Sequence, residues 1–117
     1  MSLSLKAEMV GSVTVLRCKG RIVFRDEVLA LSHRAGELIE QGRPLILDLA
    51  GVTVLDSAGL GELVALHMWA QASGCGLKIV QPSSQVRYLL ELTNLNSVLN
   101  ILSTEEEGVS ESEAEVA

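Results

Sequence analysis

The residues best suited to chemistry in this chain stand in one short segment, VTVLDSAGLGEL, at residues 52–63. An aspartate and a serine, Asp56 and Ser57, lie side by side there, and two glycines follow within four residues. A serine in such a place can act as a nucleophile, accept a phosphate, or cap the start of a helix. Each role requires different neighbours, so the neighbours of Ser57 decide among the three.

The surroundings of Ser57 argue against a serine hydrolase. A nucleophile elbow requires a glycine two residues before the serine, where this chain has Leu55. His67 stands ten residues further along the same predicted helix, which is about 15 Å at 1.5 Å per residue and too far for a base. His33 is isolated on another predicted helix, where a histidine is usually solvated. We therefore expect no catalytic residues and no enzymatic activity.

Patterns for cofactor and metal binding are also missing. The GLG segment lacks the Lys-Ser/Thr pair of a phosphate-binding loop, and Val64 stands where a dinucleotide fingerprint would have its third glycine. Cys18 and Cys75 are isolated, without CxxC spacing or a cluster of histidines. We expect no cofactor, no metal ion, and two reduced thiols in a cytoplasmic protein.

Composition favours one soluble domain with an aliphatic core. The 117 residues are 48% hydrophobic but only 3% aromatic, and this length supports a single core. No unbroken apolar run approaches the roughly 18 residues that cross a bilayer, and the first residues lack the features of a signal peptide. We expect no membrane insertion.

Acidic residues are concentrated at the end of the chain. Six of the 15 acidic residues follow Ser103 in STEEEGVSESEAEVA, and the nine that remain balance the nine Lys and Arg. A segment so acidic and polar buries too little apolar surface to offset its ordering entropy. We therefore predict a folded domain at residues 1–102 and a disordered acidic tail at 103–117. The negative charge also argues against direct binding to nucleic acid.

The hydropathy pattern predicts the elements that position Asp56 and Ser57. It indicates a hairpin of strands at 3–9 and 13–18, a continuation or third strand at 21–24, a helix from a capping Asp26 to Gly42, an interior strand at 45–51, a helix at 57–73, a strand at 77–80, a helix from Ser83 or Ser84 to about Thr93, and a last strand at 98–102. This alternation is typical of a single α/β domain, with a mixed sheet of four to five strands and helices packed against it.

Ser57 therefore falls where an interior strand passes into a helix, and sites in open α/β sheets are often built there. The first turn of a helix offers unpaired N–H groups and a favourable dipole to a phosphate. A phosphoserine at residue 57 would add close to two negative charges beside Asp56 and repel a partner that fits against a neutral hydroxyl.

Two features of the predicted helix stay open. Gly59 and Gly61 either clear space for a partner or let the helix pack tightly on the sheet. A stripe of Ser57, Gly61, Val64 and Met68 lies opposite one of Leu63, Leu66 and Ala70. The sequence does not decide which stripe faces the sheet.

The segment LDLAGVTVLDSAGLGEL, an interior strand followed by the Asp-Ser-x-Gly-Leu-Gly helix start, resembles the STAS domain anti-anti-sigma factors, also called anti-sigma factor antagonists. The resemblance spans roughly residues 3–102. It implies that Ser57 is phosphorylated by a partner that is both an anti-sigma factor and an ATP-dependent serine-protein kinase. The unphosphorylated form would bind this partner and release a sigma factor, and a serine phosphatase would restore it.

The same resemblance implies a partner-binding surface, made of Asp56, Ser57, Ala58, Gly59, Leu60, Gly61 and Val64. Two departures from the family pattern bear on it. Ala58 replaces a second serine common in the motif, which leaves Ser57 as the one phosphoacceptor within it. In the loop after Gly20, Val23 stands near a place where the family often has an acidic residue. The alternative is a STAS module that is not phosphorylated and serves as a subunit or ligand sensor in a transport or signalling assembly.

Overall fold

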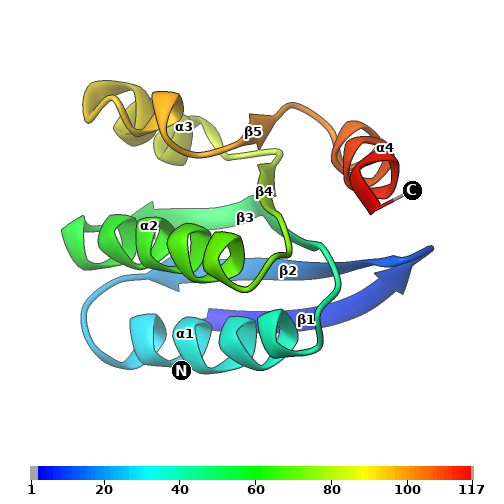
Figure 1. Ribbon diagram of the computed structural model, residues 1–117. Helices are drawn as coiled ribbons and strands as arrows, with labels where there is room; N and C mark the ends of the chain where they lie inside the picture. The colour runs from blue at the N-terminus through cyan, green and yellow to red at the C-terminus, as the bar shows by residue number, and fades with distance from the viewer. Residues whose placement is uncertain (1–2, 117) are drawn as a thin grey trace.

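The computed structural model describes residues 3–116, and its strands and helices alternate along the chain (Figure 1). In chain order they are β1 Leu3–Val10, β2 Val13–Ile22, α1 Asp26–Glu40, β3 Leu45–Leu55, α2 Ser57–Ala72, β4 Leu77–Val80, α3 Ser84–Leu92, a 3-10 turn Leu95–Ser97, β5 Ile101–Leu102 and α4 Glu105–Val116. The α/β class and the mixed sheet predicted from the sequence are confirmed, with five strands in the sheet.

The strand order β1-β2-β3-β4-β5 follows the chain, and this order determines where the helices lie. β1 and β2 form an antiparallel hairpin, whereas the pairs from β2 to β5 are parallel. Parallel neighbours need right-handed crossovers. Because the sheet grows in one direction, all three crossover helices fall on the same face. Figure 1 shows α1 and α2 side by side along that face, with α4 apart from them.

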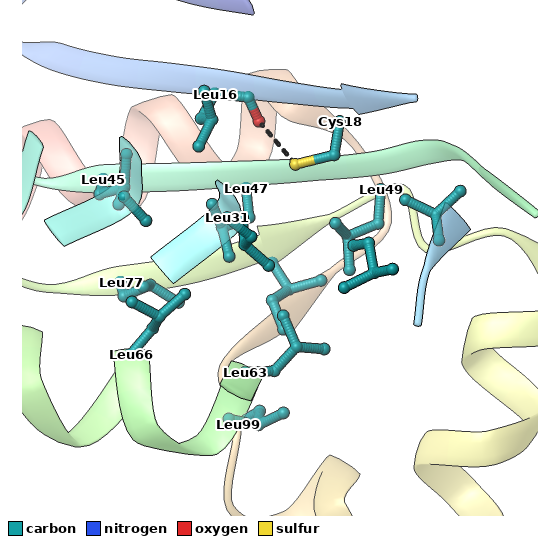
Figure 2. Packing of buried hydrophobic residues seen from close by; sticks show 14 of the residues in the cluster. Leu16, Cys18, Leu31, Leu45, Leu47, Leu49, Leu63, Leu66, Leu77 and Leu99 are labelled. Atoms are coloured by element: carbon teal, nitrogen blue, oxygen red, sulfur yellow. Dashed lines mark hydrogen bonds between the residues drawn. The ribbon is translucent and has the colours of Figure 1, made fainter. Parts of the chain in front are cut away.

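The face under α1, α2 and α3 carries the main core, which is aliphatic as the composition predicts. Alternate residues of β3, Leu45, Leu47 and Leu49, point into it and are fully buried. Leu63 and Leu66 of α2 pack into the same core, and Figure 2 shows these leucine side chains between the strands and the helix. The buried leucines of β3 and of α2 together fix the position of α2 on the sheet.

The prediction of a disordered tail is wrong for residues 105–116, which form α4. Alternate residues on the second face of the sheet make a smaller apolar cluster, Val13, Val15, Ile46 and Val80, and α4 covers it. The helix comes close because it presents a glycine: a Cβ at Gly108 would lie 2.7 Å from Cγ1 of Val80. The sequence argument counted only the few apolar groups of the tail and overlooked the apolar face that the tail covers.

The acidic residues of α4 also pair with groups of the sheet. Arg17 donates to both carboxylate oxygens of Glu105 at 3.0 Å, and Lys78 donates to Glu115 at 2.7 Å. The backbone N–H of Ser12 donates to Glu113 at 3.2 Å. Three of the acids that suggested disorder therefore attach the helix to the sheet.

Other differences from the sequence prediction are small. The strand predicted at 98–102 is reduced to Ile101–Leu102, because Val98 has a helical backbone conformation as the C-cap of a 3-10 turn at Leu95–Ser97. The segment at 21–24 continues β2 as far as Ile22 and forms no third strand. Arg25, not Asp26, is the N-cap position of α1. None of the helices within residues 3–116 is both long and apolar enough to cross a membrane.

Candidate functional site

Asp56 is the residue that organises the strand-to-helix junction. It is the N-cap of α2, with extended backbone, and its Oδ1 accepts a hydrogen bond from the N–H of Gly59 at 2.9 Å. Its Oδ2 accepts from the N–H of Phe24 at 2.8 Å, across the loop between β2 and α1. These two backbone hydrogen bonds hold the pKa of Asp56 below its usual value, the bond from Gly59 having the larger effect.

Ser57 is the first residue of α2, and it is exposed. From the sequence, Ser57 is a candidate for the helix cap, and the geometry assigns that role to Asp56 instead. The N–H groups of Ser57 and Ala58 lie in the first turn, where helix geometry gives them no intrahelical acceptor. Ser57 therefore combines an exposed hydroxyl with an electropositive helix end.

The two glycines of the motif have different surroundings. A Cβ at residue 59 would overlap the carbonyl oxygen of Ile22 and lie 2.5 Å from Cδ1 of Leu55. A Cβ at residue 61 would meet nothing within 4 Å. Gly59 therefore lets α2 pack tightly on the sheet, whereas Gly61 leaves the surface beside Ser57 low and open.

The orientation of α2 answers the question of its two stripes. Leu63, Leu66 and Ala70 are fully buried against the sheet. Along the opposite line, Ser57 and Gly61 are exposed, Val64 is half-buried, and Met68 is 61% exposed. The stripe that begins at Ser57 therefore faces outward.

The predicted partner-binding residues divide accordingly. Asp56, Ser57, Ala58, Gly61 and Val64 each have surface to offer. Gly59 and Leu60 are buried and support the surface from beneath.

Phe24 is a residue at this site that sequence reasoning missed. Its side chain is 75% exposed, and its backbone has a φ of +57°, which is rare for a residue other than glycine, asparagine or aspartate. The hydrogen bond from its N–H to Asp56 holds the loop beside α2. Val23, which the family comparison had singled out, is buried instead. The one available signal was that Phe24 is the single phenylalanine of the chain and stands just before the predicted helix.

The other chemically capable side chains are not gathered at Ser57. His33 is exposed on α1, and His67 lies three turns along α2, so neither is placed beside the serine. Burial raises the pKa of Cys18 to about 12, so this thiol stays protonated and unreactive. Within residues 3–116, no three His, Cys, Asp or Glu side chains cluster as metal ligands.

Comparison with known proteins finds a family model and a relative whose sequences match this chain. The model of the STAS domain family matches residues 4–108. The anti-sigma-B factor antagonist of Bacillus subtilis is 33% identical over 79 residues, which are 68% of this chain and 72% of that protein.

Solved structures share the fold. An anti-sigma factor antagonist from Mycobacterium paratuberculosis superposes with a TM-score of 0.85 at 23% identity, covering 96% of this chain and 95% of the other. The Bacillus cell fate determinant SpoIIAA in its phosphorylated form gives a TM-score of 0.69 at 22% identity, with 92% and 98% coverage.

Proposed function

Because this chain belongs to the STAS domain family, and within it to the anti-sigma factor antagonists, we propose that it is a cytoplasmic protein-binding switch controlled by phosphorylation of Ser57. In its unphosphorylated form it binds an anti-sigma factor that is also a serine-protein kinase, and the sigma factor is released. Phosphorylation ends this binding, and a serine phosphatase restores it.

The proposal rests on one observation: Ser57 lies at the start of α2, but the neighbouring Asp56 caps the helix. Its hydroxyl is exposed on the first turn of α2, and Asp56 already satisfies the N–H of Gly59. A phosphate there gains from the helix dipole and the first-turn N–H groups. The phosphoserine would therefore leave the fold intact and change the surface.

The binding surface that we propose consists of Asp56, Ser57, Ala58, Gly61 and Val64. It has low relief, because Gly61 has no side chain and Ala58 has a small one. A partner can therefore approach the hydroxyl closely. Two further negative charges beside the ionised Asp56 would then oppose docking by repulsion and by the cost of removing water from the phosphate.

The test is phosphorylation by the candidate kinase. Incubation of the protein with kinase and ATP should add the mass of one phosphate, and Ser57→Ala should abolish the addition. Ser84 is a matched control, because it is likewise an exposed first residue of a helix. Ser84→Ala should be modified as well as the wild type. An unchanged intact mass, or equal modification of the Ser57→Ala protein, would contradict the proposal.

Loss of binding is tested separately. The phosphorylated protein should bind the kinase at least about tenfold more weakly than the unmodified protein, a difference of about 1.4 kcal/mol. A phosphorylated form that binds equally well would contradict the switch and leave the modification itself in place.

A further inference from the structure

A second polar site lies at the other end of the sheet, around Lys78 of β4. Lys78 pairs with Ile46 near the amino end of β3, whereas Ser57 follows the carboxyl end of that strand. Its side chain is only 1% exposed, and its Nζ donates to Oε1 of Glu115 at 2.7 Å. This buried cation has no part in the function proposed for Ser57.

The two partners of this ion pair are held very differently. Lys78 belongs to a strand with neighbours on both sides, while Glu115 is 55% exposed on the last turn of α4. Helix ends open more easily than strands within a sheet. A carboxylate at a helix C-terminus is also disfavoured by the helix dipole. Glu115 can therefore withdraw while Lys78 stays in place.

Removing Glu115 would leave Lys78 without its paired charge. A buried ammonium without a partner is strongly unfavourable, because its hydration is lost and no attraction compensates. Another anion that reaches Lys78 is therefore favoured over an empty position.

Space for such an anion exists beside Glu115. Two cavities, of about 290 and 150 Å³, both border Glu115, and they share Gln71, Cys75 and Gly76. The smaller cavity also reaches Lys78, Asn100 and His67. Because Glu115 lines both cavities, its withdrawal would enlarge the space beside Lys78.

The groups around these cavities favour an oxyanion over a cation. Among the lining residues, Lys78 supplies a positive charge, Gln71 and Asn100 supply amide donors, and Glu115 is the one carboxylate. Nδ1 of His67 is buried and has no hydrogen-bond partner among the described residues. In the tautomer that carries its proton on Nδ1, this nitrogen can donate a hydrogen bond to an anion.

We propose that Lys78 is the centre of a binding site for a small oxyanion, with a carboxylate or phosphate group, and that Glu115 occupies this site until such an anion displaces it. Because the anion competes with Glu115, its apparent association constant equals the intrinsic one multiplied by the fraction of molecules in which Glu115 is withdrawn.

The test is a titration of the full chain with inorganic phosphate and, separately, with succinate, each at ionic strength matched with sodium chloride. Amide chemical shifts of Gly76, Lys78 and Asn100 report binding at the site. Glu115→Gln removes the competing charge and should tighten the apparent affinity by about tenfold or more. Glu111→Gln is the matched control, an exposed glutamate on the same helix. It should bind as the wild type does.

Saturable shifts with either anion, strengthened in the Glu115→Gln protein and absent in Lys78→Met, would support the site. Three results would overturn it: no saturable shift in Glu115→Gln with either anion, equal strengthening in Glu111→Gln, or undiminished binding by a folded Lys78→Met protein. If Lys78→Met does not fold, the comparison of Glu115→Gln with Glu111→Gln decides. Ser57→Ala should not alter anion binding, so this proposal and the one for Ser57 fail independently.

Discussion

The contrast between Gly59 and Gly61 gives the sharpest prediction, because one added methyl group has opposite effects two residues apart. In Gly59→Ala the new Cβ would overlap the carbonyl oxygen of Ile22 and press on Leu55. A backbone oxygen at a strand end cannot rotate away, so α2 would have to lift from the sheet. In Gly61→Ala the methyl group points into open space.

The magnitudes follow from two opposing effects. Alanine is favoured over glycine within a helix by up to about 1 kcal/mol, and this gain applies in full to Gly61→Ala. Overpacking a well-filled site costs about 1–3 kcal/mol. Gly59→Ala should therefore lose about 1–2 kcal/mol net, because residue 59 lies in the first turn, where the helix gain is smaller. The two variants should differ by about 2–3 kcal/mol.

Urea unfolding measures both free energies on the same scale, and an unchanged slope against urea shows that the folded state is equally compact. A Gly59→Ala protein as stable as the wild type would refute the close approach of α2 to Ile22. A destabilised Gly61→Ala protein would show that residue 61 is packed. For the proposed function, Gly61→Ala should weaken binding to the kinase partner even though it stabilises the fold.

Three further perturbations separate the roles of individual residues. Asp56→Ala should cost about 1–2 kcal/mol through loss of the cap. Since the pKa of Asp56 is lowered in the fold, the part of this contribution that comes from its negative charge is full at neutral pH and is lost as the pH falls below about 4, so the difference in urea midpoint between variant and wild type should shrink in acid. Burial raises the pKa of Glu62, so its charge opposes folding at neutral pH; Glu62→Gln should raise the midpoint at pH 7 and not at pH 4. Deletion of residues 104–117 uncovers four buried Val and Ile side chains, each contributing about 1.5–3 kcal/mol when fully buried, and should lower the midpoint sharply; an unchanged midpoint would contradict the packing of α4.

The elements around Ser57 could be predicted from sequence because each has its own local signal. The stretch at 45–49, which is apolar apart from Asp48, marks β3 as an interior strand. The Asp-Ser pair before Leu60 and Leu63 marks the start of α2. The different roles of Gly59 and Gly61 have no such signal. Whether a side chain fits at residue 59 depends on where Ile22 of β2 lies, and only the tertiary structure determines that position.

The acidic segment at 105–116 shows the limit of composition as a guide to order. Its own apolar content is low, and disorder followed from treating the segment alone. Its order depends on residues outside the segment: Arg17, 88 positions before Glu105, pairs with it, and Val80 of β4 lies close to Gly108. Phe24 was missed for a related reason. Its exposure results from a left-handed backbone held by Asp56, a contact between residues 32 positions apart.

The separate roles of Asp56 and Ser57 would allow the phosphorylation that we propose for Ser57 to occur without loss of the fold. If Ser57 were the cap, its Oγ would accept a hydrogen bond from a backbone N–H of the first turn, and a phosphate on that oxygen would disturb the start of α2. Asp56 carries the cap instead and also fixes the loop through Phe24, so both contacts persist whichever form Ser57 takes. The charge added by phosphorylation would then lie on the exposed surface, where it would affect partner binding and not folding stability. A switch built this way changes its binding and keeps the stability of the domain, because the modified atom is not one of the atoms that hold α2 to the sheet.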